Sequence, residues 1–556
     1  MPIIRLSCAI ACAVAVLSAR AAGSADFDLV LANGRVVDGS GAPWFRADVG
    51  IRGDRIVAVG NLSRSTSTRR VDLGDRMVAP GFIDLLGQSE RHVLIDNRVE
   101  SKIRQGITTE ITGEGGSIAP LNELALERWK PFLDRFHLTM NWTDLNGYFK
   151  RFEANRSTIN LGTFVGAAQV RTIVLGLDDV QPNASQLAEM ERITETAMKQ
   201  GARGVSTALI YPPGSYAKTP ELIALAKIAA RYGGVYASHI RDEADGEIQA
   251  LEEAITIGRE AHIPVEIWHL KVSGRANWGK MKDVLARIER ARAEGVDIAA
   301  NMYPYAASSN DLTANVPDWA HAGGLDQMID RFRDPAQRKK IKSQLWHGAM
   351  GDESAEGILL AGCVNPALKK YLGKRLSKVA VEMGKTPEDT LLDLIELAHT
   401  RIGVIRFTMS EDDVQLGLRQ QWVSLGIDAA GSSVDGPFAG NLTHPRAFGS
   451  AARWLGHYAR DLHLFSIEEG VRKMTSQAAQ RLGLYDRGLV RPGMAADITV
   501  FDPATVRDFA TYEDPLRYSE GIEYVIINGK VVLDAGKLTG ERPGRILKRR
   551  GRSRSE

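Results

Sequence analysis

Short apolar segments alternate with longer amphipathic ones through the middle of the chain, and this alternation constrains the fold more than any other feature. The short segments are rich in Val, Ile and Ala and are typical of strands, whereas the longer ones repeat apolar residues at helical spacing. Strands that alternate with helices form parallel sheets with crossover connections. The clearest strand–helix pairs are Arg203–Tyr211 with Thr219–Tyr232, Val235–Ile240 with Glu243–Ala261, and Pro264–Leu270 with Trp278–Ala293, followed by a strand at Val296–Tyr303.

Further apolar segments raise the number of expected strands to roughly eight, which at this chain length favours a closed barrel over an open sheet. They have the sequences MVAPGFID, GITTEITGE, INLGTFVG, GVIRFTM (Gly403–Met409) and WVSLGID (Trp422–Asp428). The sequence therefore predicts an α/β fold with a TIM-type (β/α)8 barrel over residues 81–484. Residues 306–401 interrupt the alternation, and we expect them to form an insertion that acts as a lid over the barrel mouth.

The two ends of the chain have a different texture from the middle. Residues Phe27–Val78 contain short Val- and Ile-rich segments broken by Asn-Gly and Gly-Asp turns, and the same texture returns in GMAADITVFDP and IEYVIINGKVVLDAG. Such segments are typical of short β-strands. We expect residues 26–80 and 485–544 to form one small β-sandwich domain. The basic residues of 545–556 predict a disordered tail.

Residues 1–22 have the features of a cleavable signal peptide. Arg5 precedes an apolar run from Leu6 to Leu17, and the small residues of Ala19-Arg20-Ala21 follow. The run is too short to span a bilayer, and no other stretch of the sequence approaches that length. The expected location is therefore the periplasm or the outside of the cell.

Composition limits the partners and the means of stabilisation. A formal net charge of +2 gives no sign of a nucleic-acid partner, so we expect a small-molecule substrate and leave open a homo-oligomer. Of the three cysteines, Cys8 and Cys12 lie in the predicted signal peptide. The remaining Cys363 cannot form an internal disulfide.

Four polar residues follow apolar strands at the end where barrel enzymes carry their reactive groups: Glu114, His239, His269 and Asp428. Two imidazoles and a carboxylate can hold a catalytic zinc ion and leave a position for water, while a further carboxylate can move the proton. Each residue also has an ordinary structural alternative. The histidines could be hydrogen-bonding residues of the core, Glu114 could be an exposed turn residue, and Asp428 could cap a helix.

The sequence resembles the amidohydrolase superfamily and, within it, the D-aminoacylase (N-acyl-D-amino-acid deacylase) group. The resemblance extends over nearly the whole chain after the predicted signal peptide. It is carried by NGRVVDGSGAPWFRADVGIRGDRIVAVG, APGFID, QGITTEITGEGGSIAP, GVSTALIYPPGSYA, SHIRDE, HLKVSG, YPYAAS, THPRAFGS, LGHYARDL, KMTSQAAQRLGL, GLVRPGMAADITVFDPATV and GIEYVIINGK. It implies a distorted barrel with a small β-sandwich domain.

The resemblance also implies roles for individual residues. His239 and His269 match the metal-binding histidines of the family, and Asp428 matches its general base and acid. Glu114 falls where the family places a cysteine or a carboxylate, with a one-residue gap nearby. Segments that line the substrate pocket in relatives contain Lys271, Tyr211 and Arg446, and a basic residue there would pair with a substrate carboxylate.

The sequence departs from the family at two places that matter for metal binding. Leu86 and Gln88 replace the His-x-His pair of the first barrel strand, and Ala167 stands where relatives commonly have a histidine. We therefore expect one divalent metal, zinc, bound by Glu114, His239 and His269. Gln88 would then contact these ligands or the substrate amide.

The expected activity is hydrolysis of a linear amide, with an N-acyl amino acid of D configuration as the leading substrate. Hydrolysis of a dipeptide, a lactone or a cyclic amide on the same site is an alternative, although cyclic-amide hydrolases use the missing His-x-His pair and a metal-bridging lysine. The loss of that pair also leaves open a barrel that binds a ligand without catalysis. Cobalt, manganese and iron remain alternatives to zinc.

Overall fold

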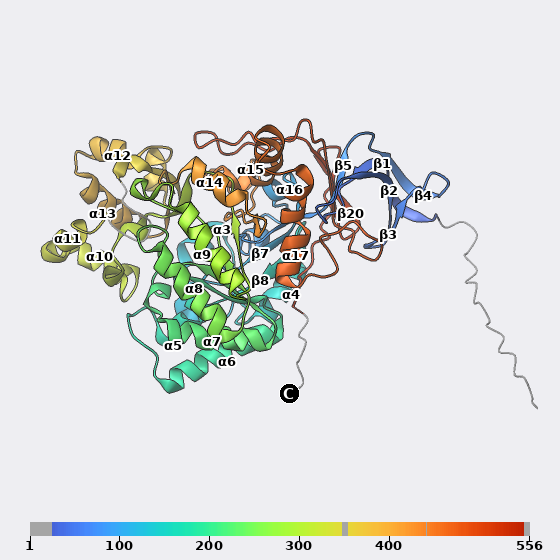
Figure 1. Cartoon of the computed structure of the whole chain (residues 1–556). Helices are drawn as coiled ribbons and strands as arrows, with labels where there is room; N and C mark the ends of the chain where they lie inside the picture. Colours follow the sequence, from blue (N-terminus) through green and yellow to red (C-terminus); the bar gives the residue numbers. More distant parts are fainter. Residues whose placement is uncertain (1–24, 347–353, 441, 550–556) are drawn as a thin grey trace, which may run out of the picture.

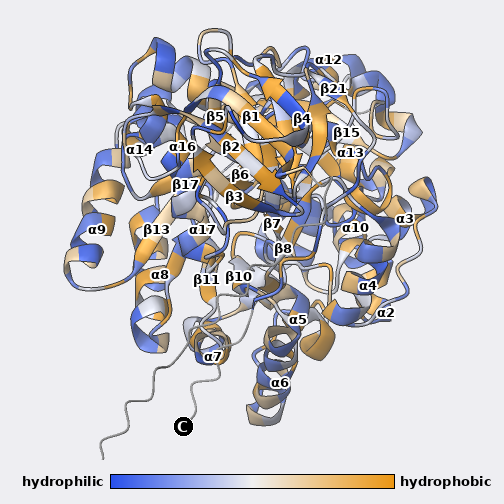
Figure 2. Ribbon diagram, turned by 90° about the vertical axis from the view of Figure 1, so that its right-hand side faces the viewer, coloured by the Kyte–Doolittle hydropathy of each residue, from blue (hydrophilic) through white to orange (hydrophobic). Residues whose placement is uncertain are grey.

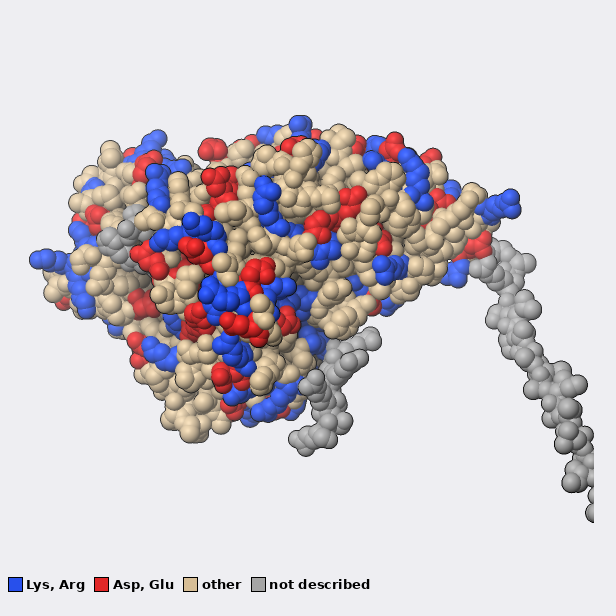
Figure 3. All heavy atoms as spheres, in the orientation of Figure 1, with Lys and Arg blue, Asp and Glu red and all other residues tan. Residues whose placement is uncertain are grey.

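The computed structural model of the chain describes residues 25–346, 354–440 and 442–549. The predicted signal peptide lies outside the described residues. No helix in the described ranges combines the length and apolarity needed to cross a bilayer. On the face shown in Figure 3, acidic and basic side chains are interspersed over the surface.

Parallel strands form a hydrogen-bonded ring at the centre of the molecule (Figure 1). β8 and β9 are consecutive and are separated only by Phe164, and β17 lies beside β6 because the Leu85 amide donates to the Leu425 carbonyl at 3.1 Å. In order around the ring, the strands are β6 (Phe82–Asp84), β7 (Ile107–Thr112), β8 (Asn160–Thr163), β9 (Val165–Gly166), β10 (Gly204–Ala208), β11 (Val235–His239), β12 (Val265–Ile267), β13 (Ile298–Met302) and β17 (Val423–Leu425).

Amphipathic helices cover the outside of this ring and turn their apolar faces toward it, as the colouring of Figure 2 shows. In α7 (Thr219–Arg231), for example, Leu222, Leu225, Ala226 and Ala229 are buried against the neighbouring strands and helices. The other outer helices are α5 (Ala167–Leu175), α6 (Ala184–Gln200), α8 (Glu247–Ala261), α9 (Met281–Ala293), α14 (Glu411–Leu418), α16 (Ile467–Met474) and α17 (Ser476–Leu482). Burial of one stripe of each helix accounts for the helical spacing of apolar residues in the sequence.

Strands from both ends of the chain join in one 9-stranded sheet. β5 pairs in parallel with β1 and antiparallel with β18, so it connects the N-terminal strands to the C-terminal ones. The N-terminal strands are β1 (Phe27–Val36), β2 (Phe45–Arg52), β3 (Arg55–Gly60), β4 (Ser67–Asp72) and β5 (Met77–Pro80). The C-terminal strands are β18 (Ile498–Phe501), β19 (Ile522–Ile527), β20 (Lys530–Asp534) and β21 (Lys537–Leu538).

The predicted insertion forms a separate unit, which lies at the opposite end of the molecule from the 9-stranded sheet (Figure 1). It has its own apolar core and an antiparallel sheet of β14 (Ser308–Asp311), β16 (Ile402–Arg406) and β15 (Ile358–Cys363). The prediction that Gly403–Met409 is a barrel strand is therefore wrong. Its helices are α10 (Leu325–Arg333), α11 (Pro335–Lys342), α12 (Leu376–Met383) and α13 (Pro387–Ala398).

The prediction of a disordered tail from Arg545 onward is wrong for residues 545–549. The Leu161 amide of β8 donates to the Arg545 carbonyl at 2.9 Å, and the Leu547 amide donates to the Leu161 carbonyl at 2.8 Å. These residues therefore extend the backbone pairing at β8, and the adjacent apolar pair of Ile546 and Leu547 packs against core clusters. Residues 550–556 lie outside the described residues.

A buried lysine in α16 predicts an unusual dependence of stability on pH. Lys473 is fully buried, and burial lowers its pKa to about 7 from an ordinary value of 10.5. Between these values the unfolded chain binds a proton that the folded chain lacks, so the free energy of unfolding rises with pH. Below a pH of about 7 the lysine is charged in both the folded and the unfolded chain, so the folded protein carries the full free-energy cost of burying the charge.

We therefore expect Lys473→Met to stabilise the protein most at about pH 6. The gain should reach a few kcal/mol, since each pH unit between the two pKa values corresponds to about 1.4 kcal/mol. Loss of the hydrogen bond to the Leu418 carbonyl offsets about 1 kcal/mol of it. Calorimetric melting temperatures between about pH 6 and pH 10 check this, with the exposed Lys537→Met as control. A gain that does not shrink as the pH rises would contradict the prediction.

Candidate metal centre and active site

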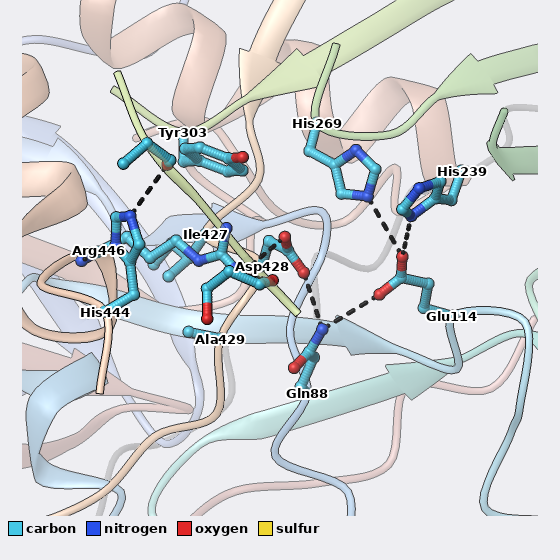
Figure 4. Close-up of polar contacts among 12 residues, drawn as sticks. Gln88, Glu114, His239, His269, Tyr303, Ile427, Asp428, Ala429, His444 and Arg446 are labelled. Atoms are coloured by element: carbon cyan, nitrogen blue, oxygen red, sulfur yellow. Dashed lines mark hydrogen bonds and ion pairs between the residues drawn. The ribbon is translucent and has the colours of Figure 1, made fainter. Parts of the chain in front are cut away.

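The three predicted metal ligands converge at one point (Figure 4). Glu114 Oε1 lies 3.0 Å from His239 Nδ1 and 3.2 Å from His269 Nε2. Ligand atoms that share a tetrahedral zinc ion at bonds of 2.0–2.1 Å lie about 3.3 Å apart. One oxygen and two nitrogens also form a donor set that zinc accepts. The predicted convergence is confirmed, and the residues fit a divalent metal.

Strand ends place these three side chains. His239 is the last residue of β11, and His269 and Glu114 each stand two residues past the ends of β12 and β7. Glu114 lies between two glycines with positive φ, Gly113 at 100° and Gly115 at 60°. A Cβ atom on Gly113 would lie 2.7 Å from the Phe164 carbonyl, and one on Gly115 would lie 2.6 Å from the Ala208 side chain. The glycines thus let Glu114 project from a turn that packs directly on neighbouring strands.

A second carboxylate, Glu243, lies on the other side of both histidine rings. Its Oε1 is 3.3 Å from His239 Nε2 and 3.3 Å from His269 Nδ1, the two nitrogens that face away from Glu114. A carboxylate in this position orients the ring and favours the lone pair on the inner nitrogen. The sequence analysis did not identify Glu243. The available signal was its position four residues after His239 in SHIRDE.

Lys271 was predicted to bind substrate, and the structure places it beside the same carboxylate. Its Nζ lies 2.5 Å from Glu243 Oε1 and 2.8 Å from His269 Nδ1, and the side chain is buried. In this structure the ammonium group therefore contacts the outer side of the His269 ring. Its role toward a substrate stays a prediction.

Charges in the cluster are strongly coupled. Burial favours protonation of Glu114, but hydrogen bonds from both histidines hold its pKa well below the ordinary value. Burial lowers the pKa of His239. Burial and Lys271 also act against charge on His269, but Glu114 and Glu243 raise its pKa to about 9. The cluster thus carries two carboxylates that favour a positive charge between them, which a metal cation can supply.

Asp428, the predicted general base, lies beside the metal ligands and is held by two other predicted site residues (Figure 4). Gln88 Nε2 donates to Asp428 Oδ1 at 2.7 Å and to Glu114 Oε2 at 3.1 Å. Arg446 Nη2 lies 2.9 Å from Asp428 Oδ2. Burial raises the pKa of Asp428 and Arg446 opposes this effect. A carboxylate in this setting can accept a proton and release it again.

Arg446 was predicted to hold a substrate carboxylate, and part of its guanidinium group is available for that purpose. The group lies 4.5 Å from the centre of the Tyr303 ring. Its Nε and Nη1 atoms are buried and have no hydrogen-bond partner among the described residues. Tyr211, also predicted to bind substrate, has its ring 5.3 Å from that of His239. Both residues therefore line the site.

Leu86 and Ala167 contribute no ligand atoms. The Leu86 side chain is fully buried in an apolar cluster, and its carbonyl accepts a hydrogen bond from the Asp428 amide at 2.7 Å. Ala167 is the first residue of α5. The structure thus brings every predicted site residue to one place, and the side chains of Leu86 and Ala167 are apolar.

The chain is similar to known proteins along nearly its whole length. The model of the amidohydrolase family matches residues 69–533. A D-aminoacylase of Alcaligenes xylosoxydans xylosoxydans is 36% identical over 535 residues, which are 95% of this chain and 98% of the relative.

Two solved structures are similar along the same length. A D-aminoacylase whose binuclear centre shows one-metal activation and second-metal attenuation has 35% identity and a TM-score of 0.79, with 94% of this chain and 100% of that chain covered. An N-acyl-D-glutamate deacylase from Bordetella bronchiseptica, in complex with zinc and a phosphonate inhibitor that mimics the tetrahedral intermediate, has 31% identity and a TM-score of 0.80, with 94% and 99% covered. The chain therefore belongs to the amidohydrolase family, in the group that contains D-aminoacylase.

Proposed function

We propose that the protein hydrolyses the linear amide bond of N-acyl D-amino acids and that it does so with a single zinc ion. The observation that carries the proposal is the convergence of Glu114, His239 and His269 beside Asp428. The activities named for the relatives, a D-aminoacylase and an N-acyl-D-glutamate deacylase, support the substrate class. We interpret the ring of parallel strands as a distorted β/α barrel and the 9-stranded sheet as a small β-sandwich domain. We further propose export, on the basis of residues 1–22.

The residues of the chain have separable tasks in this reaction. A zinc ion held by the three ligands would lower the pKa of a bound water toward neutrality and polarise the acyl oxygen. Asp428 accepts the proton of the attacking water on its carboxylate and passes it to the leaving amine nitrogen. Arg446 offers its free Nε and Nη1 to the carboxylate of the amino acid. Gln88 donates hydrogen bonds from one amide group to both Asp428 and Glu114 and thus fixes the two carboxylates relative to each other.

The residues at the first strand of the ring support the proposal of a single metal. The amide of Gln88 donates to both Glu114 and Asp428, and the side chain of Leu86 is buried among apolar residues. Neither side chain supplies a ligand for a second zinc ion.

We therefore expect the pair of changes Leu86→His and Gln88→His to add a second zinc site. Elemental analysis should find about one zinc per chain in the wild type and about two in the variant. Because each histidine supplies only part of a site, Leu86→His alone is the control and should stay at the wild-type stoichiometry. Two ions per wild-type chain would contradict the single-metal proposal.

The function itself is tested by purifying the chain, measuring bound metal and assaying N-acetyl and N-succinyl D- and L-amino acids. Hydrolysis of D substrates that stops with a chelator and returns with zinc supports the proposal. Activity restricted to dipeptides, lactones or cyclic amides would replace the substrate class and keep the site. A chain that binds no metal and cleaves none of these amides would favour a binding protein instead.

A further inference from the structure

Asp428 has a left-handed backbone conformation and is held through the backbone of its neighbours. Its φ is 54°, in the left-handed region that few residues other than glycine adopt, with aspartate among the more frequent of them. The residue lies in a loop that follows β17, where no regular secondary structure fixes its direction. Gln88 and Arg446 contact its carboxylate directly. The direction from which the side chain leaves the backbone depends in addition on what holds Ile427 and Ala429, the two neighbours labelled in Figure 4.

A buried ion pair holds both neighbours through their backbone. Asp84 Oδ1 accepts from the Ile427 amide at 2.8 Å and from the Leu86 amide at 3.1 Å. Lys102 Nζ donates to the Ala429 carbonyl at 2.8 Å and to Asp84 Oδ2 at 2.6 Å. The two side chains thus contact the backbone immediately before and immediately after Asp428.

The ion pair is completely shielded from water. The side chains of Asp84 and Lys102 are each 0% exposed. Lys102 Nζ also lies 3.6 Å from Glu110, whose Oε1 accepts from the Ser89 hydroxyl at 2.8 Å. That hydroxyl oxygen in turn accepts from the Gly431 amide at 2.7 Å. The network therefore fixes the loop after Asp428 at one further point, Gly431.

We propose that Asp84 and Lys102 are positioning residues that fix the direction of the Asp428 carboxylate for proton transfer. The proposal rests on the proposed function, because it assigns Asp428 the role of base. Burying an ion pair brings little or no net stability over well-packed apolar residues, so stability alone gives no reason for this one. The hydrogen bonds that this ion pair makes to the backbone on both sides of Asp428 suggest that its role is to position that residue. Displacement of a reacting group by about 1 Å can cost on the order of 10²-fold in rate.

The test compares Lys102→Met with Asp84→Asn/Lys102→Met. The single variant leaves Asp84 charged and unpaired, so its melting temperature should fall and its kcat should drop on the order of 10²-fold. The double variant removes both charges of the pair, so its melting temperature should recover in part, although Glu110 still lacks the cation that lies 3.6 Å away in the wild type. Its kcat should stay low, because the Ala429 carbonyl still lacks its donor. In both variants bound zinc should stay at the wild-type level and KM should change little.

Arg171→Met is the matched control, because Arg171 and Glu221 form another buried ion pair, 2.5 Å apart, and within the described residues neither side chain hydrogen-bonds to a residue of the site. It should lower the melting temperature and leave kcat near the wild-type value. Recovery of kcat in the double variant, or an equal loss of kcat in the control, would overturn the proposal. If both Lys102 variants fail to fold, the isosteric Asp84→Asn decides, and a wild-type kcat there overturns it. A wild-type chain that binds no zinc and cleaves no N-acyl amino acid would instead remove the proposed function, so the two failures are distinguishable.

Discussion

Replacing Asp428 by Asn is expected to lower kcat for amide hydrolysis by about 10³-fold while the protein keeps its full content of metal. An asparagine has nearly the same shape but cannot accept the proton of the attacking water. It keeps an oxygen for only one of the two donors Gln88 and Arg446, so one of these contacts is lost while the three metal ligands are unchanged. The measurement is steady-state kinetics on an N-acyl D-amino acid with elemental analysis of the same preparation.

The control for this experiment is Asp435→Asn in the same loop. The Asp435 side chain is 70% exposed and pairs with Arg98 away from the cluster, so kcat should not change. If Asp428→Asn keeps more than about a tenth of the wild-type kcat, the proton is moved by another group, and the assignment of the base is wrong.

Replacing His239 by Ala is expected to remove the metal as well as the activity. Two ligands remain, and a zinc site with two protein ligands binds far more weakly than one with three. We expect less than about 0.1 zinc per chain after dialysis and a loss of kcat of at least about 10³-fold. Competition with a chromophoric chelator measures the change in metal affinity directly, without an activity assay.

A histidine outside the cluster provides the comparison. His262 ends α8 with a positive φ and an exposed side chain, so His262→Asn should be tolerated and should keep its metal. If His239→Ala binds zinc as tightly as the wild type, the metal lies elsewhere. The convergence of Glu114, His239 and His269 would then need another explanation.

The residues of the site could be found from the sequence because one rule of the fold governs them. The carboxyl ends of parallel strands in a ring meet at one rim, so Glu114, His239, His269 and Asp428 lie together once each is placed after a strand. The position of each residue directly after a strand is what predicts the site, and the structure confirms that the four residues converge.

The contacts behind the site could not be found in the same way. The approach of Lys271 to Glu243, and of Lys102 to Asp84, depends on how strands and loops pack across the fold, and no periodic pattern in the sequence encodes such a pair. Gly403–Met409 shows the same limit for strands. An apolar run predicts a strand, but its partner is set by tertiary packing, and β16 pairs within the insertion. The basic residues near the C-terminus suggested a disordered tail, but Ile546 and Leu547 pack against the core, and residues 545–549 are therefore ordered.

The sheet built from both ends of the chain restricts when the protein can finish folding. Met77 in β5 pairs with Phe501 in β18, and Arg545 bonds to Asp54 at 2.6 Å across 491 positions. These partners are absent while a ribosome is still producing the middle of the chain, and contacts so distant in sequence form slowly. The N-terminal strands therefore cannot pair with β18, and β5 keeps an unpaired edge, until the C-terminal strands have been synthesised. A nascent chain of this kind should depend on chaperones that keep such edges from aggregating.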